Sequence, residues 1–203
     1  DTAGELWGWA EAYTNGTVSS VVSTEPMRPL IDHGVLPELH KAELYAHFAA
    51  VFDRDVATCE ALAQRAHQRG TELVDLTRVA PLLARGDIER ACDVFVGAPN
   101  ASILDSDGNL IIADVFSSIE DVELVAAMLS RNTLRDFLIV EALDHPQSAG
   151  AVLLTVARNF GGAIRANALC LWAMVAVSLG LNGWAIAALM TAQEEVHGHS
   201  LSL

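Results

Sequence analysis

Apolar residues recur at helical spacing along most of the chain. From residue 55 onward they return every three or four positions, as on one face of an amphipathic helix. One stripe covers residues 56–66 and is predicted to end at Gly70, and a second covers 73–83 and is predicted to end at Gly86. Pro81 lies inside the second stripe, so this helix is expected to start later or to kink there.

Further stripes predict the remaining helices of an all-α protein. Ser117 or Ser118, followed by Glu120 or Asp121, has the spacing of a capping box at a helix start. Helices are predicted at residues 37–52, 87–95, 121–129, 134–143, 146–160, 163–179 and 183–196. With about eight or nine helices and short connections, we expect a helical bundle or array rather than a doubly wound sheet.

Two stretches lack the helical spacing of apolar residues. Residues 1–36 are irregular, and Asn15-Gly16 before a β-branched run is typical of a short hairpin. In residues 97–116, two apolar runs flank Asp107-Gly108; they fit a hairpin or a long loop that enters a helix, and the loop is the favoured interpretation.

The domain organisation follows from this division of the chain. We expect one mostly helical domain over residues 1–203. Its irregular N-terminal segment covers residues 1–36, helices follow at 37–96, a loop at 97–116 and further helices at 117–203. The chain begins with Asp1 and stops on an apolar stretch, from which we expect a fragment of a longer protein.

Residues 168–193 carry no charge over a length that would suffice to cross a bilayer. Gly180-Leu181 and Asn182-Gly183 interrupt the run with a helix-stop signal, and the flanks lack clusters of Lys and Arg. Two short buried helices joined by a tight turn explain the run better than a membrane span.

Charge and cysteine content narrow the classes of partner. The chain has 26 acidic and 12 basic residues, and this net charge of −14 repels nucleic acids and anionic lipid headgroups. Three widely spaced cysteines fit neither a disulfide framework nor a zinc ribbon. We therefore expect a cytoplasmic protein that binds neither nucleic acid nor membranes.

The end of the chain resembles one helix-turn-helix unit of the tetratricopeptide type. After Gly180, the residues Ala185, Leu189 and Ala192 fall where that repeat places small, bulky and small side chains between its two helices. Because a solenoid needs about three such units, one unit indicates a local motif and not a repeat protein.

Taken with other segments, this end resembles the actinobacterial domain-of-unknown-function 4192 family. The resemblance runs through Thr24-Glu25-Pro26 to Leu36-Pro37-Glu38, residues 121–129, the step Leu134-Arg135-Asp136 and the terminal helix pair. The family's Gly-x-Gly turn reads Gly180-Leu181-Asn182-Gly183 here, and Leu181-Asn182 replace the charged residue usual in the family. The resemblance implies the C-terminal helical part of such a protein, and it implies no activity, cofactor or catalytic residue.

One group of side chains has the spacing of a metal site. His40, Glu43 and His47 lie on one face of the helix predicted at residues 37–52, and imidazole and carboxylate groups suit zinc or a similar ion. The sequence shows no further ligand, so a solvated polar stripe is the alternative. No cofactor is expected.

Four residues are predicted to have structural roles. Arg135 and Asp136 lie between apolar positions, so Arg135 is expected to reach a carboxylate such as Asp121 or Glu141 and to tie helices together. Gly180 and Gly183 are expected to form the turn between the last two helices.

The sequence contains no phosphate-binding glycine loop, no nucleophile elbow and no cysteine with an obvious histidine partner. The hypothesis is therefore a helical interaction or scaffold domain that binds another protein or a copy of itself, and an enzyme is not favoured. The alternative is a small-ligand-binding or metal-binding domain, or an enzyme with a site of histidines and carboxylates. An exposed apolar patch would favour the first hypothesis, and a deep polar pocket would favour the second.

Overall fold

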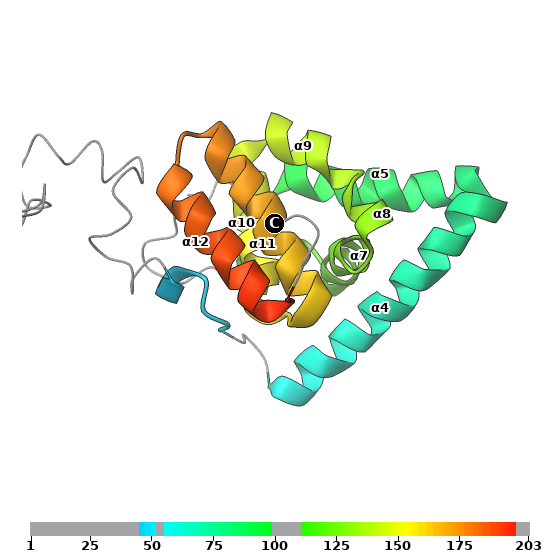
Figure 1. The fold of residues 1–203 in the computed structure, drawn as a ribbon. Helices are drawn as coiled ribbons and strands as arrows, with labels where there is room; N and C mark the ends of the chain where they lie inside the picture. The colour runs from blue at the N-terminus through cyan, green and yellow to red at the C-terminus, as the bar shows by residue number, and fades with distance from the viewer. Residues whose placement is uncertain (1–44, 52–54, 99–110, 198–203) are drawn as a thin grey trace, which may run out of the picture.

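The fold is an array of α-helices, as predicted from the sequence. The computed structural model describes residues 45–51, 55–98 and 111–197, and these residues form helices and connecting turns with no strand (Figure 1). The hairpin predicted at Asn15-Gly16 and the loop or hairpin around Asp107-Gly108 lie outside the described residues.

The helices follow one another with short connections. They are α4 (Val56–Val79), α5 (Pro81–Gly97), α6 (Ile112–Val115), α7 (Ile119–Leu129), α8 (Asn132–Arg135), α9 (Leu138–Asp144), α10 (Pro146–Asn159), α11 (Gly162–Ser178) and α12 (Asn182–Glu195). In the described residues, none of these helices has the length and apolar character that a membrane span requires.

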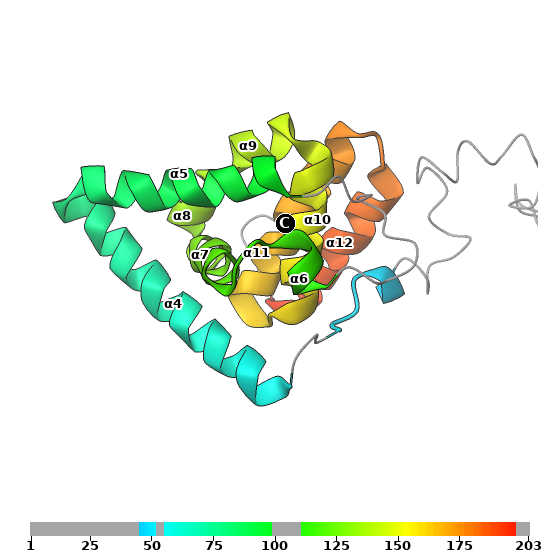
Figure 2. The same cartoon turned by 180° about the vertical axis from the view of Figure 1, so that it is seen from behind.

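The first two described helices form a V whose corner points away from the rest of the molecule. Helix α4 ends at Val79, and α5 begins at Pro81, which occupies the first helical turn where a missing N–H is tolerated. Figures 1 and 2 show α7 between the two arms of this V, with the corner far from α12.

The predicted ends at Gly70 and Gly86 are wrong, because α4 and α5 continue through these glycines. Gly70 faces α7 so closely that a Cβ atom at this position would overlap Ser130 Oγ and lie 2.7 Å from the carbonyl oxygen of Ala127. Gly70 therefore allows two helices to approach, and the tertiary contact outweighs the low helix propensity of glycine. A Cβ atom at Gly86 would meet nothing within 4 Å.

Other predicted boundaries agree with local start signals. The side chain of Ser118 accepts a hydrogen bond from the N–H of Asp121 at 3.1 Å, which caps α7. Pro146 begins α10, and Phe160 and Gly161 separate α10 from α11, whose first residue is Gly162. Gly162 has a φ of 60°, a conformation that favours glycine.

Two predicted helices are shorter than expected. The helix expected at residues 134–143 is split into α8 and α9, because the chain turns at Asp136 and Phe137. In the helix expected at 37–52, the described residues are helical at 45–47 and turn at Phe48.

Helix α11 lies at the centre of the core. It packs against α7, α9, α10 and α12, and it is buried on almost every side, as expected of a helix that is apolar around its circumference. Trp172 on α11 is fully buried and packs against Phe48 with ring centroids 4.8 Å apart. Residues 45–51 are thereby joined to the C-terminal helices.

Candidate functional site

The histidine of the predicted metal site that can be described lies among aromatic rings. His47 makes edge contacts with Phe48 and Trp184, with ring centroids 4.9 and 5.0 Å apart. His40 and Glu43 lie outside the described residues, so the predicted site stays a prediction. Within the described ranges, no group of three or more His, Cys, Asp or Glu side chains is arranged to hold a metal.

Two buried arginines hold residues 45–51 against the C-terminal helices. Arg158 on α10 donates two hydrogen bonds to the carbonyl oxygen of His47, at 3.1 and 2.9 Å. Arg165 on α11 donates to the carbonyl oxygen of Phe48 at 2.6 Å, and the N–H of Val51 donates to the carbonyl oxygen of Arg158 at 3.0 Å. Arg165 Nε also lies 3.2 Å from Glu195 Oε2, so both guanidinium groups are engaged within the chain.

Arg135 joins three helices through amide and carboxylate partners. Its Nη1 donates to Asn167 Oδ1 on α11 at 2.7 Å, and its Nη2 lies 2.7 Å from Asp136 Oδ1. Asn167 in turn donates from Nδ2 to the carbonyl oxygen of Leu129 at the end of α7, also at 2.7 Å. The buried charge is thus hydrogen-bonded on several sides, which burial of an ion requires.

The expected partners of Arg135 were the wrong carboxylates. Asp121 lies 2.9 Å from Arg90 Nη2 on α5 instead, so it joins α5 to α7. The partner found, Asp136, is the next residue in the chain, and the connection between helices is made by the amide of Asn167.

Gly180 closes the turn between α11 and α12 in a Schellman motif. It has a φ of 78°, in the left-handed region. The N–H of Leu181 donates to the carbonyl oxygen of Ala176 at 2.8 Å, and the N–H of Gly180 donates to that of Val177 at 3.0 Å. Leu181 is buried below the turn, and Gly183 is buried in the first turn of α12.

The thiols of Cys92 and Cys170 are poorly suited to nucleophilic chemistry at neutral pH. Burial, together with the nearby carboxylates of Glu141, Asp93 and Glu89, raises the pKa of the Cys92 thiol to about 11. Burial also raises the pKa of Cys170 to about 11, although Arg135 opposes this shift. Since the thiolate is the reactive form, little of either group is reactive at pH 7.

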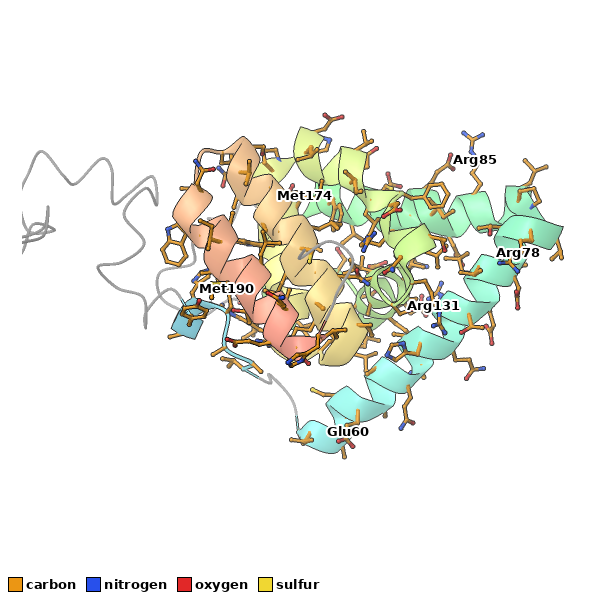
Figure 3. The ribbon with its side chains drawn as sticks, in the orientation of Figure 1. Glu60, Arg78, Arg85, Arg131, Met174 and Met190 are labelled. Carbon is orange, nitrogen blue, oxygen red and sulfur yellow. The ribbon has the colours of Figure 1, made fainter. Side chains whose placement is uncertain are left out.

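One concave feature in the described part of the chain is apolar. Helices α9, α11 and α12 enclose a groove of about 410 Å³, which we call the apolar groove; it is lined by Leu143, Cys170, Ala173, Met174, Val177, Ser178 and Leu189. Exposed apolar side chains also occur on α9 and α12, at Val140, Ile186 and Met190, and at Phe137 just before α9. In Figure 3, Met174 and Met190 lie over α11 and α12, far from the corner of the V.

The charges on the helices around the apolar groove have one sign. Between residues 136 and 197 the acidic side chains are Asp136, Glu141, Asp144, Glu194 and Glu195. The basic side chains of the same range, Arg158 and Arg165, are both buried. This part of the surface therefore combines apolar side chains with carboxylates and exposes no Arg or Lys.

Sequence reasoning did not find the apolar groove, because it assigned the apolar residues of 168–193 to the core. A signal was nevertheless present: both terminal helices are apolar on more sides than a single partner helix can cover. Val177 and Ile186 are more than half exposed, at 55% and 54%.

A second depression is polar, and its arginine is already paired with carboxylates of the chain. It lies between α5 and α7, has a volume of about 180 Å³, and includes Arg90 and Asp121. Arg90 also lies 3.3 Å from Glu120, so its charge is balanced by two carboxylates of the same chain.

The geometry thus defines an all-α domain with an apolar groove between α9, α11 and α12. The family model for "Domain of unknown function (DUF4192)" matches residues 2–203, and the chain belongs to this family. Neither the curated proteins nor the solved structures compared with the chain give a match.

Proposed function

We propose that this chain is a protein-interaction domain that binds a helical segment of a protein in the apolar groove, and that the segment carries apolar and basic side chains. The observation that carries the proposal is the groove itself, which is open and apolar and lies on helices α9 and α12, whose Asp and Glu side chains are not balanced by an exposed Arg or Lys on the same helices. Apolar patches of this kind on a soluble protein commonly mark interaction sites.

The shape and lining of the groove support a helical partner. Amphipathic helices bind in grooves between helices through apolar side chains spaced three or four residues apart. Met174 lines the groove, and the flexible, polarisable methionine side chain adapts to partner side chains of different shapes. The absence of His and carboxylate side chains from the groove lining speaks against the alternative of a polar catalytic or metal site there.

The charge around the groove supports a basic partner. Asp144 on α9 and Glu194 on α12 make no ion pair in the described part of the chain, and they are available to Arg or Lys of a bound segment. Charge complementarity of this kind selects partners and accelerates their encounter. It also disfavours acidic segments.

We place this interaction in the cytoplasm, with no role for nucleic acid. The three cysteines are odd in number and widely spaced in the sequence, a pattern that fits a reducing compartment. The net charge of −14 opposes binding to a phosphate backbone.

The test uses the methionine methyl groups as reporters in the full chain. The protein is labelled with ¹³C at the methyl groups of its four methionines and titrated with a synthetic helical peptide of leucine and arginine, with leucine at positions i, i+3, i+4 and i+7. We expect the Met174 methyl signal to shift and the signal of Met128, a fully buried residue of α7, to stay in place.

Two controls decide the outcome. A peptide with glutamate in place of arginine should bind more weakly, because α9 and α12 carry Asp144 and Glu194 and no Arg or Lys. Val177→Asp in the groove should abolish the shift, whereas Val96→Asp on α5, at a position of similar exposure (55% and 52%), should not. A Met174 signal that does not move, or a Val177→Asp variant that binds like the unaltered chain, would overturn the proposal.

A further inference from the structure

We infer that the segment that enters the apolar groove is the corner between α4 and α5 of a second copy of this chain. This inference rests on the proposed function and gives its partner an identity. We define the α4–α5 corner as residues 76–86.

The α4–α5 corner exposes three large apolar side chains next to one another. Val79, Leu82 and Leu83 are 78%, 83% and 71% exposed, and Pro81 lies between them. Single exposed apolar residues are common on soluble proteins, but a group of three at a projecting corner has the composition of a contact surface. Figure 1 shows that this corner extends away from the other helices.

The charges of the α4–α5 corner are opposite to those around the groove. Residues 76–86 include Arg78 and Arg85 and no acidic residue. Arg78 makes no ion pair in the described part of the chain. Arg85 is paired with Glu89 at 2.6 Å, but both side chains are exposed, so this pair contributes little and can be exchanged.

The two surfaces therefore complement each other in polarity and in charge. In such a contact, Leu82 and Leu83 would fill the apolar groove between α9, α11 and α12, and Arg78 would face Asp144 or Glu194. The corner carries the apolar and basic side chains that are proposed to bind the groove. Because its helix is already folded, binding does not have to order it.

The α4–α5 corner of one copy cannot reach the apolar groove of the same copy. Helix α4 has 24 residues and is about 36 Å long, so it holds the corner away from α12. Figure 3 shows Arg78 and Arg85 at one end of the molecule and Met174 and Met190 toward the other. Because two different surfaces meet, the contact is head-to-tail, and it leaves one corner and one groove free at the ends of each assembly.

The net charge of −14 opposes association of identical copies. Screening at physiological salt limits this repulsion to a range of about 8 Å, so the local contact decides whether two copies associate. A corner in a groove buries a small area, and contacts of this size are typical of transient complexes.

The test is a complementation experiment with two variants of the full chain. Leu83→Asp places a charge on the corner, and Val177→Asp places a charge in the groove, so each variant keeps one of the two surfaces intact. Both side chains are exposed in the unaltered chain. In sedimentation velocity, we expect the unaltered chain to form larger species as its concentration rises. Each variant alone should associate about tenfold or more weakly, because a charge replaces a side chain that the contact would bury.

An equimolar mixture of the two variants should restore association and stop at a heterodimer. The intact corner of the Val177→Asp chain enters the intact groove of the Leu83→Asp chain, and no further pair of intact surfaces remains. Val56→Asp, at another exposed first-turn position, serves as the matched control and should associate like the unaltered chain. Monomers in the mixture, or a Leu83→Asp chain that associates normally, would overturn the inference.

The peptide titration separates this inference from the proposed function. If the leucine-arginine peptide shifts the Met174 signal while the unaltered chain stays monomeric at all concentrations, the groove binds such segments but the second copy is the wrong occupant. If the peptide does not bind, the proposed function fails as well.

Discussion

Replacing Gly70 with alanine tests the close approach of α4 and α7. The added methyl group would overlap Ser130 Oγ and lie 2.7 Å from the carbonyl oxygen of Ala127, closer than non-bonded carbon and oxygen atoms approach. A rotation of Ser130 could remove the first overlap, but it would break the hydrogen bond from Ser130 Oγ to the same carbonyl, 2.7 Å long. The second overlap involves backbone, so the two helices must move apart.

The expected loss of stability follows from two opposing contributions. Alanine in a helix interior stabilises by about 0.5–1 kcal/mol relative to glycine. Overpacking of a close contact costs about 1–3 kcal/mol. We therefore expect Gly70→Ala to lower the free energy of unfolding by roughly 1–2 kcal/mol, which lowers the melting temperature by roughly 2–8 °C in a chain of this size.

Gly86→Ala is the matched control, because Gly86 also lies inside a long helix but has nothing within 4 Å of the added methyl group. This variant should raise the free energy of unfolding by about 0.5–1 kcal/mol. Both variants are measured by urea unfolding followed by circular dichroism at 222 nm. If Gly70→Ala stabilises the chain as Gly86→Ala does, the close packing of α4 on α7 is refuted.

Three further predictions concern the buried network, a helix cap and the groove thiol. Asn167→Ala should lower the free energy of unfolding by about 1–3 kcal/mol, since it leaves Arg135 and the carbonyl of Leu129 without a buried partner; urea unfolding measures the loss, and a change below 0.5 kcal/mol would contradict it. Ser118→Ala removes the cap of α7 and should cost about 1 kcal/mol by the same assay, whereas Ser118→Asp should retain most of the stability. Alkylation of Cys170 by iodoacetamide, followed by mass spectrometry, should accelerate about tenfold per pH unit between pH 8 and pH 10, because its pKa is raised to about 11; a plateau near pH 9 would contradict the raised pKa.

Local signals in the sequence predicted the class of fold and many helix boundaries. Pro81, Pro146 and Ser118 act within one helical turn, so their effects can be recognised without knowledge of the tertiary structure. The error at Gly70 has the opposite origin: its role depends on Ser130 and Ala127, which are distant in the sequence.

The contacts of the candidate site were less predictable because they join distant segments. The amide partner of Arg135 lies 32 positions away, and the carboxylate partner is adjacent. The groove could not be separated from the core by composition, since Leu189 and Val177 belong to the same apolar runs as the buried residues. Whether an apolar side chain is exposed depends on how the helices pack together, so the local sequence does not reveal it.

The attachment of residues 45–51 to the last helices has a consequence for the order of events during protein synthesis. Phe48 and His47 are bound by side chains that lie 117 and 111 positions later in the chain. A ribosome therefore releases this segment long before its binding surface exists, while the intervening helices α4–α9 can already pack locally. We expect residues 45–51 to dock in one of the last steps of folding, only after α10 and α11 have left the exit tunnel.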